Sequence, residues 1–174
     1  DQKGIAELFG PSYGSAWKIC SEMALQFAIV GSGEKWCEAE LESLQSRLPN
    51  LRVRTGWNEG LAHLVEAGSD FFMMPSRYEP CGLNQMYALR YGTIPIVRRT
   101  GGLRDTVRDM GDGGWGICHD QASVWDINYS ITRAIDLYND KTRFDAVRKM
   151  GMELDHSWET AAQQYLNLYQ SLIP

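Results

Sequence analysis

The sequence has few cysteines and histidines, and their spacing excludes most metal and disulfide classes. The four cysteines stand far apart and form no Cys-x-x-Cys pair: Cys20, Cys37, Cys81 and Cys118. The three histidines share no ligand spacing: His63, His119 and His156. We therefore expect neither a metal site nor the disulfide framework of a small secreted protein, and the pattern favours a reducing compartment.

The chain also lacks a long apolar run that could span a bilayer, and it lacks a signal-type start. Its net charge is −5 at pH 7 and its pI is about 5.2. This acidic balance argues against a general binder of nucleic acid or of anionic membranes, whose surface would be basic. The sequence begins at Asp1 without a methionine, and we expect it to be an excised fragment.

What is present is the composition of one globular domain: 174 residues, 44% hydrophobic and 22% charged, enough to bury a core. Apolar runs of strand length alternate with segments of helical periodicity. The expected strands cover residues 25–30, 51–54, 71–74, 94–97 and 115–118. The expected helices cover 15–23, 34–48, 59–68, 82–91, 123–138, 141–152 and 157–171, the third of them capped by Asn58.

Buried strands that alternate with helices require a parallel sheet covered on both faces. The expected fold class is therefore α/β, a doubly wound, Rossmann-like parallel sheet. In such a sheet ligands bind at the carboxyl ends of the strands, so loops that follow strands share one rim. The suggestive loops of this kind are 31–33, 56–58, 75–82 and 98–102.

Positive charge is concentrated in the stretch from Ser76 to Arg108, where six arginines stand against Glu79 and Asp105. These are Arg77, Arg90, Arg98, Arg99, Arg104 and Arg108. Gly82 opens the expected helix 82–91, whose free first-turn amides form a positive pole, and we favour a phosphate site there over a purely conformational glycine. The Thr100-Gly101-Gly102 turn offers a second set of exposed amides, although a glycine pair alone usually marks a turn.

Each candidate side chain also has a structural interpretation. Glu79 either bonds to helix amides or contacts a substrate, and the residues alone do not decide between them. Cys81 could be reactive at a helix N-terminus, but a small buried residue is the commoner case. Trp57 could stack on a nucleobase or lie at a core edge. Lys3 and the Arg98–Arg99 pair would ordinarily be solvated surface charges.

Ordered motifs run along the whole chain. Three central ones are Pro75-Ser-Arg-Tyr-Glu-Pro-Cys-Gly-Leu-Asn-Gln85, Tyr91-Gly-Thr-Ile-Pro-Ile-Val-Arg-Arg-Thr-Gly-Gly-Leu103 and Asp105-Thr-Val107. Others are Gln2-Lys-Gly4, Gly31-Ser-Gly33, Gly56-Trp-Asn-Glu59, Ser157-Trp-Glu159 and Tyr165-Leu-Asn-Leu-Tyr169. In residue identity and order these motifs closely resemble those of the bacterial glycogen synthase and plant starch synthase family, over nearly the entire chain.

The resemblance implies a retaining glycosyltransferase of two Rossmann-like domains, the GT-B plan, of which residues 1–174 form most of the C-terminal, nucleotide-binding domain. It implies transfer of glucose from ADP-glucose to the 4-hydroxyl of an α-1,4-glucan. The implied catalytic residues are Glu79, beside the donor glucose, and Lys3, on the diphosphate. No metal or other cofactor is implied, because ADP-glucose is the substrate and ADP the product.

The same resemblance implies a set of substrate-binding residues. Trp57 takes the position of an aromatic side chain that stacks on adenine, and Cys81 would contact the donor without acting as a nucleophile. The distal phosphate would lie on the amides at Gly82 and Leu83, together with Thr100, Gly101 and Gly102. The remaining members of the expected set are Arg77 and Asn84.

The chain also departs from the family pattern. Members have a strand ending in Ser-Arg-Leu just before the Gln-Lys-Gly motif, so we expect the first strand and its diphosphate-binding arginine to be missing, together with the N-terminal domain. We expect the fragment alone to be inactive and the helix 157–171 to pack toward that absent domain. Gly113-Gly-Trp-Gly116 replaces the Gly-Thr-Gly usual in the family, so the loop there is expected to be shorter.

Two rival interpretations stay open at this point. One is a UDP-sugar-dependent retaining glycosyltransferase of the same fold, and the other is a non-catalytic nucleotide or glucan binding module. None of the three implies a nucleic acid or membrane partner. The family resemblance implies the cytoplasm of a bacterium or the plastid stroma of a plant.

Overall fold

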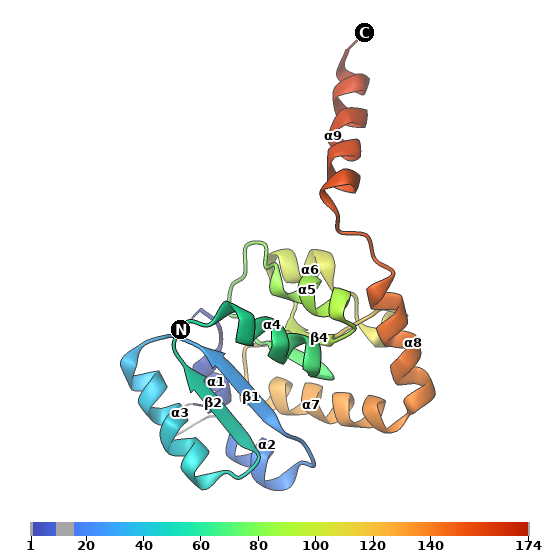
Figure 1. The fold of residues 1–174 in the computed structure, drawn as a ribbon. Coiled ribbons are helices and arrows are strands. Elements are labelled where there is room, and N and C mark those ends of the chain that lie inside the picture. Colours follow the sequence, from blue (N-terminus) through green and yellow to red (C-terminus); the bar gives the residue numbers. More distant parts are fainter. Residues whose placement is uncertain (1, 10–15, 174) are drawn as a thin grey trace.

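The computed structural model describes residues 2–9 and 16–173 and has the alternating strands and helices of an α/β fold (Figure 1). Its strands are β1 (Phe27–Gly31), β2 (Leu51–Thr55), β3 (Phe71–Met74), β4 (Ile94–Arg98) and β5 (Ile117–His119). Its helices are α1 (Ile5–Phe9), α2 (Ala16–Glu22), α3 (Lys35–Arg47), α4 (Glu59–Gly68), α5 (Asn84–Tyr91), α6 (Gly101–Thr106), the 3-10 helix η1 (Met110–Asp112), α7 (Val124–Asn139), α8 (Lys141–Met152) and α9 (Trp158–Leu172).

Every expected strand and helix is present, and the ends differ by no more than two residues. Two residues that the sequence analysis used, Asp1 and Ser15, lie outside the described part of the chain. Helices α1, η1 and α6 were not predicted from the sequence. Gly101 and Gly102 were expected in a loop, whereas they begin α6.

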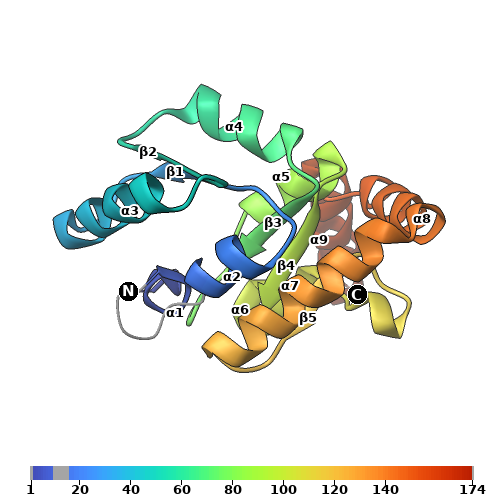
Figure 2. The ribbon, with the colours of Figure 1, turned by 90° about the horizontal axis from the view of Figure 1, so that it is seen from below.

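All strand pairs are parallel, but the strands form two separate sheets, β1-β2 and β3-β4-β5 (Figure 2). The α/β class and its parallel pairing are therefore confirmed, and the described strands pair as two sheets with a break between β1 and β3. In a doubly wound sheet of order 3-2-1-4-5-6, the first strand lies between the second and the fourth. If β1 is counted as the second strand of this order, the break between β1 and β3 lies where the first strand would be.

Helices cover both faces of the three-stranded sheet. On β4, Ile94 and Ile96 pack toward α7 and α8, whereas Val97 packs with Leu103 of α6. Alternate side chains of a strand point to opposite faces, so this pattern requires cover on both sides. The residues of β4 from Ile94 to Val97 are accordingly all buried.

A larger core cluster lies on the other side of the break and joins α1, α2, α3, β2 and α7. Its buried members are Leu8, Phe9, Ile19, Cys20, Leu41, Leu44, Leu48, Leu51, Ile127 and Ile131. Met73 of β3 packs against this cluster. Side chains therefore connect the two sheets where no backbone pairing is described.

Helix α9 extends away from the rest of the chain (Figure 1) and has no buried residue. Its exposed apolar side chains are Trp158, Tyr165, Leu166, Leu168, Tyr169 and Leu172. None of the described helices is long and apolar enough to cross a membrane.

Candidate functional site

The candidate site lies at the carboxyl ends of β3 and β4, where the loop after β3 folds against the start of α6. The amide of Gly102 donates to the carbonyl oxygens of Glu79 at 3.0 Å and Pro80 at 3.2 Å. A Cβ on Gly101 would overlap with the Glu79 carbonyl, and one on Gly102 would overlap with the Cys81 carbonyl. The glycine pair is therefore what permits the loop to approach α6 this closely.

The beginning of the chain lies on the same loop. Gln2 accepts a bond from the Arg77 amide at 2.9 Å, and its side chain donates to the Tyr78 carbonyl at 3.0 Å. Gly4, at φ 72°, comes so close to Pro75 that a Cβ there would overlap with the Pro75 carbonyl. These contacts explain the Gln-Lys-Gly motif, since they fix the backbone on both sides of Lys3.

The two expected catalytic residues lie together although they are 76 positions apart. The Lys3 ammonium forms an ion pair with Oε2 of Glu79, and the Ser76 hydroxyl donates to the same oxygen at 3.3 Å. The Glu79 side chain is only 8% exposed, whereas that of Lys3 is 58% exposed. The carboxylate makes these two bonds, and the described residues provide it with no bond from a helix amide.

The amides before α5 are not bonded to any acceptor among the described residues. Helix α5 begins at Asn84, and its N-cap residue Leu83 provides no side-chain cap, so Gly82, at φ 73°, precedes the helix by two residues. Gln85 is buried below them and donates to the Gly82 carbonyl at 2.9 Å and to Thr106 at 3.0 Å. Among the described residues, no acceptor is bonded to the amides of Gly82 or Leu83, so these amides are available to an anion.

The Thr100-Gly101-Gly102 turn is less open than expected. The Thr100 amide donates to the Arg98 carbonyl at 2.8 Å, and that of Gly102 is taken by the loop. The expectation that the amides of all three residues are exposed is therefore wrong, because two of these amides already donate to protein acceptors. The amide of Gly101 has none among the described residues.

Three arginines of the basic stretch are engaged around this loop. Arg77 pairs with Glu7 of α1, with Nε 2.7 Å from Oε1. Arg98 donates to the carbonyls of Arg77 and Asp120, and Arg99 pairs with Asp120 at 3.1 Å. The expectation of solvated charges is therefore wrong for Arg98 and Arg99, which connect the ends of β4 and β5.

Three further expected residues are exposed on the rim. Trp57 is 83% exposed after Gly56 at the end of β2, so a core-edge position is wrong. Cys81 is also exposed, contrary to the commoner buried cysteine. Asn84 is exposed as the first residue of α5.

Sequence reasoning missed a buried ion pair behind β5. Asp109 accepts from Arg133 at 2.6 and 3.0 Å and from the amides of Gly111 and Cys118, both at 2.7 Å. Burial acts to raise the pKa of Asp109, but the bonds from Arg133 and the two amides outweigh it and lower that pKa below its usual value. The pair connects the segment between α6 and η1 to α7.

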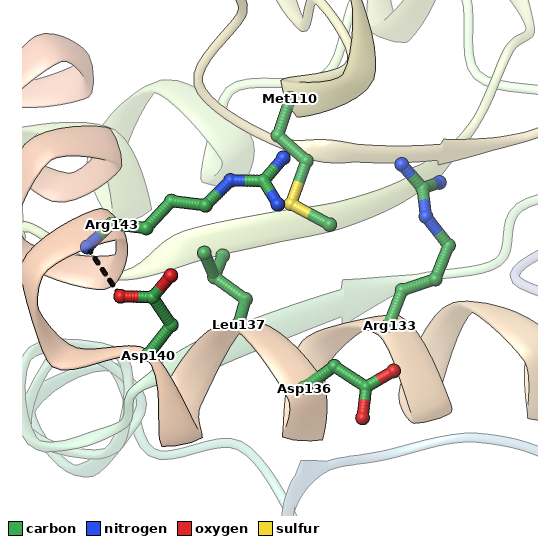
Figure 3. A pocket seen from close by; sticks show the side chains of 6 residues that line it. All are labelled: Met110, Arg133, Asp136, Leu137, Asp140 and Arg143. Atoms are coloured by element: carbon green, nitrogen blue, oxygen red, sulfur yellow. Dashed lines mark hydrogen bonds between the residues drawn. The ribbon is translucent and has the colours of Figure 1, made fainter.

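A cavity of about 310 Å³ lies beside this ion pair, between η1, α7 and α8 (Figure 3). It is lined by Met110, Arg133, Asp136, Leu137, Asp140 and Arg143. None of these residues belongs to the expected substrate-binding set. The described ranges hold no cluster of three or more His, Cys, Asp or Glu side chains that could bind a metal ion.

A parallel α/β fold with a carboxylate, a lysine and unbonded amides at the carboxyl edge of its strands defines a Rossmann-like domain. Residues 15–148 match the family described as glycosyl transferases group 1. The chain belongs to this family.

Relatives in the family identify a narrower group. The chain is 54% identical to the glycogen synthase of Treponema denticola, over 99% of this chain and 36% of that protein. It is also 54% identical to the glycogen synthase of Flavobacterium johnsoniae, over 97% of this chain and 37% of that protein. The chain thus spans little more than a third of the length of these curated relatives.

Solved structures agree with the fold. The catalytic domain of starch synthase IV from Arabidopsis thaliana, bound to ADP and acarbose, is 34% identical and superposes with a TM-score of 0.85, over 98% of this chain and 36% of that one. Sucrose-phosphate synthase from Thermosynechococcus elongatus is 22% identical, with a TM-score of 0.71 over 98% of this chain and 42% of that one. The second similarity concerns the fold alone. Together with the sequence relatives, these findings confirm the family resemblance.

Proposed function

We propose that the chain is the donor-binding part of a glycogen or starch synthase, a hexosyltransferase that transfers glucose from ADP-glucose to the 4-hydroxyl of an α-1,4-glucan with retention of configuration. The observation that carries this proposal is the meeting of Lys3 and Glu79 beside the open amides of Gly82 and Leu83. The 54% identity to glycogen synthases supports it further. We propose that this chain alone is inactive.

The residues divide the work of donor binding. The amides of Gly82, Leu83 and Gly101 hold the distal phosphate, and Lys3 holds the diphosphate. Glu79 holds the glucose, and Trp57 stacks on the adenine. The other proposed substrate contacts surround them, at Arg77, Cys81, Asn84, Thr100 and Gly102.

The reaction breaks the bond between the anomeric carbon and the ADP oxygen and forms a bond to the acceptor oxygen. The leaving phosphate accepts the proton of the 4-hydroxyl on the same face of the sugar, which retains the configuration. Lys3 and the positive end of α5 stabilise the charge that develops on ADP, and such preorganised charge lowers the barrier. We propose that the reaction uses no metal or other cofactor.

The partners and the compartment follow from the same proposal. The second substrate is an α-1,4-glucan, and the exposed apolar face of α9 packs against the N-terminal domain of the complete enzyme. Neither nucleic acid nor a membrane is a partner. The enzyme works in the bacterial cytoplasm or in the plastid stroma.

Calorimetric titration of the 174-residue chain with ADP tests donor binding. We expect saturable binding of ADP, weaker binding of UDP, and a loss of about tenfold or more in ADP affinity in Lys3→Met, since a hydrogen bond between charged groups is removed. Preference for UDP would favour a UDP-sugar enzyme of the same fold. If ADP and ADP-glucose both fail to bind the chain and the complete two-domain protein, the proposed function is wrong.

A further inference from the structure

The Glu79 side chain is little exposed to solvent and has a single cationic partner among the described residues. Its carboxylate is nearly buried, and both of its bonds, from Lys3 and from Ser76, go to Oε2. A buried carboxylate without a countercharge is costly. Lys3 therefore balances the charge of Glu79.

Lys3 is free to change partner without moving its backbone. Gln2 and Gly4 are held on the loop 75–78, whereas the Lys3 side chain is 58% exposed. A lysine has a flexible four-carbon stem and a compact charge with three donors, so its ammonium can turn to a new anion nearby. The open amides of Gly82 and Leu83 follow Glu79 by three and four residues on the same loop.

We propose that Lys3 is an exchange residue: it pairs with Glu79 when the site is empty and moves to the diphosphate when a nucleotide binds. The move leaves the Glu79 carboxylate available to the hydroxyl groups of the donor sugar. Phosphate binding and sugar recognition are thereby coupled through one side chain. This inference rests on the proposed function, because it takes the ligand to be a nucleoside diphosphate sugar.

The exchange has a thermodynamic consequence. ADP must break the Lys3–Glu79 ion pair and has no sugar to occupy Glu79, so part of its binding free energy is lost. Removing the charge of Glu79 breaks this ion pair before ADP binds, so Lys3 is already available to the diphosphate. Glu79→Gln is therefore expected to raise ADP affinity by about threefold to tenfold, the range of a partly exposed ion pair.

A double-mutant cycle measures this coupling by calorimetry. ADP is titrated into the 174-residue chain, into Glu79→Gln, into Lys3→Met and into the double variant. We expect the gain from Glu79→Gln in the Lys3 background and no gain in the Lys3→Met background. Glu59→Gln is the matched control, because it removes a carboxylate from the exposed start of α4, which has no recorded bond to Lys3; its ADP affinity is expected to stay within about twofold. Adenosine, which has no phosphate, is expected to bind Glu79→Gln and the unaltered chain equally.

The outcomes separate the possible causes. A gain that persists in the Lys3→Met background would indicate simple charge repulsion and overturn the exchange. No gain in either background would overturn it as well. Absence of ADP binding in every protein, the unaltered chain included, would instead count against the proposed function.

A second measurement titrates the unaltered chain itself and uses a variant only to assign the signal. The side-chain ammonium of Lys3 is followed by NMR, with Lys3→Met assigning the signal. We expect ADP to shift this signal and adenosine to leave it in place. A signal unmoved by saturating ADP would overturn the proposal.

Discussion

A glycine is required at position 102, because a backbone carbonyl group lies too close to leave room for a side chain and cannot move away. The Gly102 amide holds the Glu79 carbonyl, and a Cβ would overlap with the carbonyl of Cys81. We expect Gly102→Ala to lower the free energy of unfolding by about 1–3 kcal/mol and to weaken ADP binding, since the loop must withdraw from α6.

Urea unfolding and ADP titration measure these two effects. Gly33→Ala is the matched control, because a Cβ at Gly33 would meet no atom within 4 Å. If Gly102→Ala were as stable as Gly33→Ala, the loop 79–81 would be able to pack against α6 in another conformation.

Asp109 should make stability depend on pH. Hydrogen bonds from Arg133 and two amides hold its folded pKa below the ordinary 3.8, against the effect of burial. A carboxyl group whose pKa is lowered by folding contributes stability above its unfolded pKa, and this contribution is lost as pH falls through the folded pKa. Asp109→Asn is therefore expected to be less stable than the unaltered chain by about 3 kcal/mol near neutral pH, with the difference shrinking below about pH 4.

Urea unfolding of both chains between about pH 7 and pH 3 measures the difference. A constant difference across this range would mean that Asp109 contributes through packing and not through its charge.

The sequence identified some residues of the site but not their partners. Lys3 and Glu79 were found through motifs, yet their pairing depends on the docking of residues 2–4 on a loop more than seventy positions away. The exposure of Cys81 could not be predicted, because the Gly102 amide sets the path of the loop. Asp109 and Arg133 stand 24 positions apart in no motif, so no local signal indicated their ion pair.

At the scale of elements, the strands were predictable because burial on both faces leaves continuous apolar runs such as Ile94–Val97. Helix α6 was missed because it begins with two glycines, which usually break helices. Helix α6 forms because its first turn packs against the loop 79–81. This is a tertiary contact, which the local sequence does not indicate. Short α1 was missed for a related reason, since its buried Leu8 and Phe9 belong to a core shared with α7.

The cap of α4 connects helix stability to the site. The side chain of Asn58 accepts from the Leu61 amide at 2.9 Å, and Trp57 directly precedes it. Asn58→Ala should lower the free energy of unfolding by about 1 kcal/mol. It should also weaken ADP binding modestly, because the backbone that presents Trp57 loses its anchor.

Asn58→Asp serves as the control for this cap. It keeps the acceptor and is favourable at a helix N-terminus, so its stability should match that of the unaltered chain. Equal stability of all three chains in urea would show that water replaces the cap without cost.

At the scale of the whole molecule, the break between the two sheets divides the chain into unequal parts. Strand β4 is buried from Ile94 to Val97, whereas β1 has no buried residue. The β1–β2 part is connected to the rest by side chains, through a core cluster that includes Ile127 and Ile131 of α7 and is contacted by Met73. Backbone pairing across the break is absent from the described strands.

This division predicts that the two sheets open independently. Segments with fewer buried contacts open at lower free energy than the global transition. The amides of β1 and β2 are therefore expected to exchange with deuterium at least about ten times faster than those of β4, measured by mass spectrometry under native conditions. Saturating ADP should slow exchange at the amides around Gly82 and leave β1 nearly unchanged. Equal protection in β1 and β4 would mean that the shared side-chain core is strong enough to make both sheets one cooperative unit despite the break.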